Sequence, residues 1–517
     1  MASRRDELNA YTFAKKRTVA AFLQPSPTGT EEGAPRPLKA IVPSVIVAAL
    51  CLAGFGAWGM FKPKAPQGWD TPGAKVIVGK QSTTRYVVLS TGKGKDKKVL
   101  LHPVLNLASA RLMLDPQKFD VIQVSDDILD SGKLSRGPIL GIPYAPDRLP
   151  GATEAGKAKR WAVCEQPGGG KDSVQKAAFV FADRDFKLTD DKRRLAGGQV
   201  LYVQGQKNKA RYVVDAKGTK YLVKGAPGDL LARTLFGADE QPQPVTDDWL
   251  ATLGDGTPVD FPAIPGTVGA PAGTGGGLSP QEDKVGMVLR AQTGAGPQQY
   301  VVLQGKVQPV SDFTAWLLLN SPQTTKLGMR GDVKDVDAAS IAPKPDYFGA
   351  ANNWPEKKAK QVNAGGGAAA PGARSTVCSV LRKVDDKGGT TLSTWAGTEY
   401  PAAITAGGTS TYVTPGTGLL YTQVQGKQTK PDGSLFLVTD TGLRYAVQAN
   451  GDSDAARSDI GTGDQQKQDD GRPEPSQAQQ RLGYEKVTPA LVPINWSEFL
   501  SKGPRLDTNS ARQPQGS

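Results

Sequence analysis

The stretch of residues 41–61 is apolar except for Ser44 and contains no charged residue. At the rise of an α-helix, its length of about 21 residues gives about 31 Å, which is enough to cross the hydrocarbon core of a bilayer. A secretory signal peptide has a shorter apolar core directly after a basic segment, and a small-residue cleavage site after that core. Here about 40 residues precede the stretch, and KPKAPQGW follows its final Phe. We therefore predict a membrane anchor that remains in the protein.

The segment before the anchor is basic. Residues 1–24 place apolar side chains at roughly helical spacing among several Lys and Arg, which predicts a basic amphipathic helix, and residues 25–40 form a Pro-rich linker. Basic residues also flank the anchor on both sides, with Arg36 and Lys39 before it and Lys62 and Lys64 after it. This local charge count leaves the orientation in the membrane open.

The long segment after the anchor is polar and rich in turn-forming residues. The chain has 61 Gly, 39 Pro and 7% aromatic residues, which favours many short strands and several modules over one helical bundle. Its net charge is +13, but the basic residues are scattered and do not alternate with aromatic residues in a stripe. This pattern favours a basic surface that faces anionic envelope polymers or lipid, and predicts no nucleic-acid partner.

A strand-like pattern recurs four times in this segment, at 84–89, 210–215, 298–303 and 443–447. Tyrosine and valine suit half-buried strands, and each run is bounded by glycine or charged turns. Apolar helix-like runs follow two of the four, with Asn106 and Ser311 or Asp312 as expected N-caps. The repetition predicts four similar modules whose cores contain the matching tyrosines Tyr86, Tyr212, Tyr300 and Tyr445.

A second correspondence joins residues 245–260 to residues 492–507, VTDDWLATLGDGTPVD to VPINWSEFLSKGPRLD. In both, a valine, a tryptophan and a leucine are spaced four apart and so lie on one helical face. Trp249 and Trp496 are therefore expected to anchor a helix onto the strands of their own module. The alternative role, an exposed platform for a ligand, is less typical of such a stripe.

Two cysteines lie outside the anchor, which itself contains Cys51. Cys164 ends the sequence RWAVC and Cys378 ends RSTVC, so both follow a valine and an arginine at the same spacing. Two similar strands placed side by side would bring the two side chains within bridging reach. In an oxidising compartment this isolated pair would form one disulfide, whereas in the cytosol the two would remain unrelated buried thiols.

The search for catalytic chemistry is negative. With His102 as the sole histidine, a His-based triad and a multi-His metal site are nearly excluded. None of the Gly-Lys pairs has both the upstream glycine and the following Ser or Thr of a Walker A loop. No combination of nucleophile, base and orienting group can be identified. We predict no catalytic residue, no cofactor and no metal site.

Several stretches resemble the EccB family, the single-span membrane component of the type VII (ESX) secretion system of actinobacteria. Besides the anchor near residue 40, the matching stretches are RRDELNAYTFAKKRTVAAFL, LHPVLNLASARLML, GPILGIPYAPDRLP, RWAVC and VPINWSEFLSKGPRLD. The resemblance extends over almost the whole chain apart from the linkers, and the joint order of these stretches with one anchor is specific to the family.

This resemblance implies an α+β protein with a cytoplasmic N-terminal helix, one transmembrane helix and a large extracytoplasmic region. That region would contain a β-rich central core with a disulfide corresponding to Cys164–Cys378, and four small α/β repeat modules. The implied role is a structural subunit in contact with membrane lipid that self-associates and assembles with the EccC ATPase, EccD and EccE. Family members have also been labelled as ATPases, and their repeats likened to cell-wall-binding modules. A weak ATPase and a peptidoglycan-binding module are therefore the alternatives.

The anchor also contains small residues that would allow close helix–helix approach, Gly54, Gly56, Ala57 and Gly59, and these predict a docking surface within the membrane. The expected domain boundaries are 1–40 for the cytoplasmic helix and linker, 41–61 for the transmembrane helix, 72–118 for module one, 119–196 for the first part of the central core, 197–261 for module two, 262–283 for a linker, 284–352 for module three, 353–373 for a linker, 374–415 for the second part of the core, 416–507 for module four with a disordered insert at 451–480, and 508–517 for a disordered tail.

Overall fold

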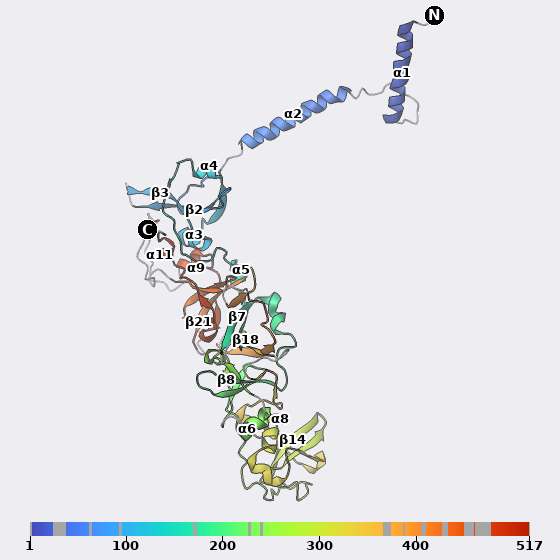
Figure 1. Cartoon of the computed structure of the whole chain (residues 1–517), viewed down its shortest axis with the longest axis vertical. Coiled ribbons are helices and arrows are strands. Elements are labelled where there is room, and N and C mark those ends of the chain that lie inside the picture. The colour runs from blue at the N-terminus through green and yellow to red at the C-terminus, as the bar shows by residue number, and fades with distance from the viewer. Residues whose placement is uncertain are drawn as a thin grey trace.

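The computed structural model describes residues 3–23, 38–61, 65–92, 96–168, 173–225, 229–237, 241–365, 374–385, 388–404, 410–425, 433–448, 460 and 477–515. Two helices, α1 (Arg4–Leu23) and α2 (Leu38–Phe61), precede a long body of strands and short helices and lie apart from it (Figure 1). No residue of α1 is buried. Among the described residues, α2 supplies the one helix long and apolar enough to span a membrane, over Ile41–Gly59.

Four of the five sheets in the body share one topology. In each, three consecutive antiparallel strands form a meander, and a later strand pairs in parallel with the first strand of the meander. In three of the sheets another short strand pairs in parallel with the third strand; in the remaining one a single bridge between Val307 and Pro343 takes that place. The four predicted modules are therefore repeats of one sheet.

Each of these four sheets has the following strands, in their order across the sheet. Module one has β4 (Asp120–Val124), β1 (Lys75–Gly79), β2 (Arg85–Thr91), β3 (Lys98–Pro103) and β5 (Ser135–Arg136). Module two has β11 (Gln243–Val245), β8 (Gln199–Gly205), β9 (Arg211–Val214), β10 (Thr219–Leu222) and β12 (Gly254–Asp255), with β17 (Lys360–Gln361) also on β8. Module three has β16 (Lys334–Val336), β13 (Val288–Thr293), β14 (Gly296–Leu303) and β15 (Lys306–Val310). Module four has β24 (Ala490–Pro493), β21 (Gly418–Val424), β22 (Leu435–Thr439), β23 (Leu443–Ala446) and β25 (Ser501–Lys502).

The fifth sheet is the central core, with the strand order β19 (Thr390–Gly397), β18 (Thr376–Val384), β6 (Arg160–Pro167), β7 (Val174–Phe181) and β20 (Thr411–Val413). Short helices lie between the strands, namely α3 (Leu107–Met113), α4 (Asp126–Leu129), α5 (Ala152–Ala155), α6 (Leu230–Phe236), α7 (Asp247–Leu250), α8 (Asp312–Leu319), α9 (Gln477–Arg481), α10 (Ile494–Ser497) and the 3-10 turns η2 (Asp183–Thr189), η3 (Pro322–Leu327), η4 (Ala338–Ser340) and η5 (Ala350–Asn352). The helix α11 (Thr508–Ala511) follows the last strand.

The expected N-caps of two helices are present. The Asn106 side chain accepts a hydrogen bond from the Ser109 backbone N–H at the start of α3. The Ser311 hydroxyl accepts one from the Thr314 N–H at the start of α8, so Ser311 is the cap and Asp312 is the first helical residue. Each cap satisfies an N–H group that has no partner within its helix.

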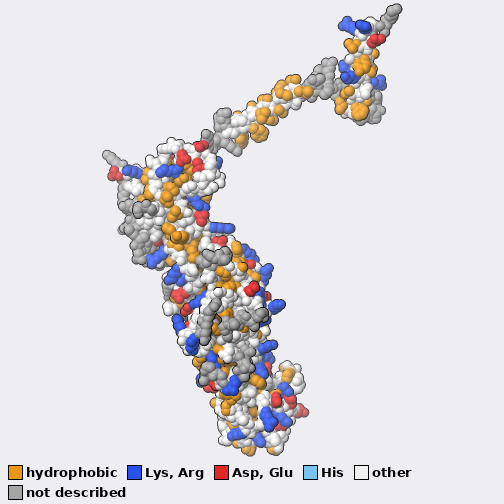
Figure 2. All heavy atoms as spheres, viewed as in Figure 1, with side chains coloured by type: hydrophobic (Ala, Val, Ile, Leu, Met, Phe, Trp, Pro, Cys, Tyr) orange, Lys and Arg blue, Asp and Glu red, His pale blue; other side chains and the backbone are white. Residues whose placement is uncertain are grey.

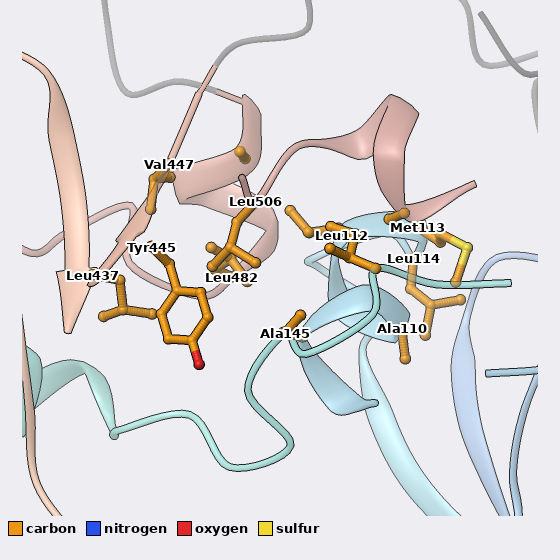
Figure 3. Packing of buried hydrophobic residues seen from close by; sticks show 14 of the residues in the cluster. Ala110, Leu112, Met113, Leu114, Ala145, Leu437, Tyr445, Val447, Leu482 and Leu506 are labelled. Atoms are coloured by element: carbon orange, nitrogen blue, oxygen red, sulfur yellow. The ribbon is translucent and has the colours of Figure 1, made fainter. Parts of the chain in front are cut away.

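The modules lie in a row, joined by hydrophobic clusters that neighbours share (Figure 1). Modules one and four share a cluster in which the end of α3 packs against residues of module four, including Tyr445, Leu482 and Leu506 (Figure 3). At the other end of the row, Phe313 and Leu317 of α8 pack into module two, while Ala315 and Leu318 of the same helix pack into module three. The central core lies between these two pairs, so every module is fixed to a neighbour by burial of apolar surface.

Tyr445 is not equivalent to the other three tyrosines, contrary to the expectation from the sequence. Tyr86, Tyr212 and Tyr300 lie on the second strand of their meanders, whereas Tyr445 lies on the third strand, β23. In module four the second-strand position is held by Phe436, which pairs with Tyr421 and Ala446. Neighbouring strands of a meander carry the same alternation of apolar residues, so a short pattern does not identify which strand it belongs to.

The ring on the third strand of the meander explains why modules two and four have a glycine at matching places, Gly256 and Gly503. Tyr445, Tyr221 and His102 hold this position in modules four, two and one, each paired with an apolar residue of the second strand. A Cβ at Gly503 would lie 2.6 Å from the Tyr445 ring, and one at Gly256 would lie 2.4 Å from the Tyr221 ring. These glycines let the last segment of each module lie flat against the ring.

Three of the expected boundaries and segments are wrong. Module one extends beyond residue 118, because β4 and β5 belong to its sheet and Val104 bridges Leu140. The expected linker 262–283 instead packs onto module three through Ile264, Val268 and Ala272. Glycine and proline predict turns but do not distinguish a linker from a loop whose few apolar residues are buried.

The C-terminal tail is also ordered over its described part. Residues 508–511 form α11, in which Ala511 is completely buried, and the Gln515 N–H donates to the carbonyl of Ile139 at 2.9 Å. Of the expected linker 353–373, residues 360–361 form β17, and residues 366–373 lie outside the described residues. Most of the expected insert 451–480 also lies outside them, apart from residue 460 and the start of α9.

Candidate functional site

The centre of the body is a disulfide in the core sheet. β6 and β18 are antiparallel neighbours, and their register places Cys164 directly opposite Cys378. The two residues form a disulfide with a Cα–Cα distance of 4.0 Å, and both are completely buried. The link therefore joins the two halves of the core, which are 214 residues apart in the sequence.

The two matched tryptophans lie on the other face of the same sheet. Trp249 of α7 and Trp496 of α10 belong to one cluster, together with core residues such as Val163 and Val377 that neighbour the cysteines in sequence. The Trp249 Nε1–H also donates to the carbonyl of Val163 at 3.0 Å. Because side chains alternate along a strand, the disulfide lies on one face of the core sheet while modules two and four attach to the opposite face.

Glu165 is a completely buried carboxyl group at the junction of the core with module two. Its side chain accepts hydrogen bonds from the backbone N–H of Thr246, at 2.8 Å, and from the Thr246 hydroxyl. Thr246 in turn caps α7, the helix that carries Trp249. Burial raises the pKa of Glu165 to about 7, although the hydrogen bonds from Thr246 and the charge of Lys176 favour the ionised form.

The stability of this junction should therefore depend on pH. A carboxyl group with a folded pKa of about 7 and an ordinary value of 4.5 holds its proton more tightly in the folded state. Its contribution to the unfolding free energy is greatest below pH 4.5, falls by about 3 kcal/mol between pH 4.5 and about 7, and changes little above that. Denaturant unfolding between pH 5 and 8.5 should show most of this decline followed by a plateau, and Glu165→Gln should abolish it.

Glu282→Gln is the matched control for this prediction. Glu282 lies on a turn and is partly exposed, and the hydrogen bonds from Ser279 lower its pKa, so it stays ionised across the whole range. This variant should keep the pH dependence of the parent. A slope that persists unchanged in Glu165→Gln would assign the effect to another group.

The described residues offer no evident catalytic centre. Within them, no group of three or more His, Cys, Asp and Glu side chains could hold a metal ion. An open hollow of about 490 Å³ lies where the core meets modules two and four, but its charges are partly paired, with Lys176 Nζ 3.0 Å from Asp248 Oδ2. On the face shown in Figure 2, Lys and Arg side chains are interspersed with Asp and Glu and form no continuous basic stripe.

The remaining residues singled out in the sequence lie in separate places. Tyr86, Tyr300 and Tyr445 are buried in their modules and Tyr212 is partly buried, each in a different sheet. Ala57 is exposed on α2, and a Cβ added at Gly54, Gly56 or Gly59 would meet nothing within 4 Å. Their role as a docking surface stays a prediction.

Sequence reasoning missed Glu165 and Thr246. Glu165 directly follows Cys164, where the matching residue after Cys378 is Ser379. A charged residue within an otherwise apolar strand is a usable signal, because such a residue is rarely buried without a partner. The partner, however, lies 81 residues further along the chain and is visible only in the fold.

The comparisons with known proteins agree on one family. The family model described as "Type VII secretion system ESX-1, transport TM domain B" matches residues 1–516. "ESX-1 secretion system ATPase EccB1" of Mycobacterium tuberculosis is 28% identical over 284 residues, 54% of this chain and 53% of that protein, so the chain spans about half the length of this relative. "ESX-3 secretion system ATPase EccB3" of Mycolicibacterium smegmatis is 26% identical over 444 residues, 79% of this chain and 75% of that protein.

Solved structures show the same fold. A chain of the intact ESX-5 inner membrane complex superposes with a TM-score of 0.54 at 20% identity, covering 100% of this chain and 96% of that one. The EccB3 dimer from the ESX-3 core complex gives a TM-score of 0.53 at 22% identity, covering 85% of this chain and 99% of that one. Because the family model matches residues 1–516 and the fold is shared with solved structures, the chain belongs to the EccB family of type VII secretion proteins.

Proposed function

We propose that the protein is a structural subunit of a type VII secretion complex, anchored by α2, whose body forms a scaffold outside the cytoplasmic membrane. Its proposed partners are EccC, EccD, EccE and further copies of itself. The observation that carries this proposal is the arrangement of the body, in which repeats joined by shared hydrophobic clusters follow one membrane-length helix. Such an arrangement provides an extended surface for contacts with other proteins. The described residues offer no evident catalytic or metal site.

The buried disulfide supports the proposed orientation. Structural disulfides persist in oxidising compartments and are rare in the cytosol. Cys164 and Cys378 lie in the centre of the body, so the body should be outside the cytoplasm and α1 inside. The disulfide thus supports one orientation of the chain in the membrane, which the charges flanking the anchor leave open.

Gentle detergent extraction of the full chain with a C-terminal tag tests the proposal. We expect EccC, EccD, EccE and untagged copies of the chain to remain attached and to be identified by mass spectrometry. ATP hydrolysis should be found only in samples that contain EccC, because the sequence of this chain has no Walker A loop. Recovery of the chain alone, or attached only to cell-wall fragments, would contradict the scaffold.

A substitution in α2 refines the same experiment. A Cβ at Gly56 meets nothing within 4 Å, so Gly56→Leu leaves the isolated helix intact and adds bulk only where another helix would pack. We expect a lower yield of attached subunits. Val47→Leu is the control, because Val47 lies on the opposite side of the helix from Gly56, and it should leave the yield unchanged. Equal yields from both variants would remove the docking role of Gly56.

A further inference from the structure

The hollow where the central core meets modules two and four contains a buried arginine. Its volume of about 490 Å³ lies in the range of sites that bind small molecules. Arg444 of β23 lines the hollow and is 4% exposed, so almost all of its side chain is removed from water. A buried charge is costly unless an opposite charge is paired with it. Arg444 therefore needs a counter-charge, either from the chain or from a ligand.

The described residues hold Arg444 in place but do not neutralise it. Its Nη1 donates to the Gln423 side-chain oxygen at 3.0 Å and to the Ser497 hydroxyl at 2.8 Å, and both acceptors are uncharged. Its Cζ lies 5.1 Å from the centre of the Phe436 ring, a contact that offsets part of the cost of a buried cation. Its Nε is buried without a hydrogen-bond partner, and no carboxylate of a described residue forms an ion pair with the guanidinium. The guanidinium is therefore fixed in position and lacks a counter-charge.

Module two has, at the same place, the ion pair that module four lacks. Lys220 and Arg444 are each the second residue of the third strand of their meander, β10 and β23. In the parallel pairing with the short strand β12, Lys220 lies opposite Asp255, and its Nζ is 2.6 Å from the Asp255 carboxylate. In the equivalent pairing with β25, Arg444 lies opposite Lys502. Module four thus has a second cation where module two has the counter-ion, although both build the same sheet.

The other charged groups of the hollow leave it with an excess of positive charge. Lys176 of the core and Lys502 also line it, together with the carboxylates of Asp248 and Glu498. Lys176 Nζ is 3.0 Å from Asp248 Oδ2, so these two groups largely neutralise each other. Glu498 is exposed and forms no ion pair with a described residue. One solvated carboxylate therefore remains for two cations, of which Arg444 is buried.

We propose that the hollow binds a small anion through a carboxylate or phosphate group, with Arg444 as the central contact and Lys502 beside it. The guanidinium has donors beyond the two hydrogen bonds of Nη1, and oxyanions are the groups that it binds most strongly. The anion supplies the counter-charge that Asp255 supplies in module two. Because the core, module two and module four all line the hollow, a bound anion also joins these three parts of the body. The site goes beyond the proposed scaffold, which requires no small ligand.

Isothermal titration calorimetry of the detergent-extracted full chain tests the site, with citrate as the carboxylate probe and pyrophosphate as the phosphate probe. We expect saturable binding of at least one probe, with one site per chain, and the tighter probe identifies the group that the site prefers. Sodium chloride at equal ionic strength should give no saturable heat. The absence of binding by both probes at about 1 mM would refute the proposal.

Lys502→Asp transfers the ion pair of module two to module four. The introduced carboxylate lies opposite Arg444 in the strand register and supplies its counter-charge from within the chain. We expect this variant to bind the tighter probe at least about tenfold more weakly, while its unfolding midpoint equals or exceeds that of the parent. Loss of binding without loss of stability is not expected from a substitution that merely damages the fold. Unchanged affinity in Lys502→Asp would remove the hollow as the binding site.

Two further variants control for net charge and for folding. Lys98→Asp makes the same change of charge at an exposed residue of β3 in module one, and should leave the affinity unchanged. Glu498→Gln removes the carboxylate that competes for the two cations, and should tighten binding about two- to fivefold. An equal loss of affinity in Lys98→Asp and Lys502→Asp would assign binding to the net charge of the chain and overturn the site. A Glu498→Gln variant that binds no more tightly than the parent would also contradict it.

Discussion

Replacing Cys164 and Cys378 together by alanine will lower the free energy of unfolding of the central core by about 5 kcal/mol. The disulfide joins positions separated by 214 residues, so its loss frees a long segment of the unfolded chain. In the chain-entropy model the stabilisation grows with the logarithm of this length. Denaturant unfolding of the full chain in detergent, followed by fluorescence of the core tryptophans Trp161 and Trp395, measures the change.

Two comparisons make this result specific to the disulfide. Cys51→Ala, at an exposed position of α2, should leave the unfolding curve of the body unchanged. Addition of a reductant to the unfolded parent chain before refolding should reproduce the effect of the double variant. A loss below about 1 kcal/mol would mean that the core sheet constrains the two halves without the covalent link.

Trp249→Ala should cost the second largest amount, about 3–5 kcal/mol, because it leaves a cavity at the junction of the core and module two. Trp249 is completely buried, and its indole N–H donates to the carbonyl of Val163. The truncation therefore removes packing and also leaves a buried carbonyl without this donor. Equilibrium unfolding measured by near-UV circular dichroism gives the size of the loss.

Trp249→Phe is the graded control, since it keeps an aromatic ring and loses the indole hydrogen bond. We expect it to lose clearly less than Trp249→Ala. Tyr347→Ala, at a half-exposed residue of module three, should change stability by less than about 0.5 kcal/mol. A Trp249→Ala variant as stable as Tyr347→Ala would contradict the role of Trp249 in joining the module to the core.

The large-scale organisation was predictable from the sequence because its signals are local. An uncharged apolar run of membrane length is visible without any tertiary contact, and the structure forms α2 over it. A recurring Tyr-Val run revealed the repeats, since tyrosine and valine favour half-buried strands within a single segment. The RWAVC and RSTVC contexts indicated paired strands, and β6 and β18 are neighbours in register at the cysteines.

The details that failed depend on contacts between distant segments. Tyr445 carries the same alternation as Tyr86 but lies on a different strand of its meander. The edge strand β5 has two residues and becomes a strand only through its pairing with β3. Residues 262–283 resemble a linker in composition, yet Ile264 and Val268 are buried against module three. None of these contacts produces a periodicity or a composition that could be recognised within a single segment of the sequence.

By itself, then, the sequence determined the anchor and the existence of repeated modules around paired cysteines, because periodicity and apolar run length are properties of one segment. Only the tertiary structure decided where each module ends, which face of the core sheet carries the disulfide, how Glu165 is buried beneath Thr246, and that Arg444 is buried without a counter-charge. The physical reason is that burial and hydrogen-bond satisfaction belong to pairs of segments, and the partners here lie tens to hundreds of residues apart.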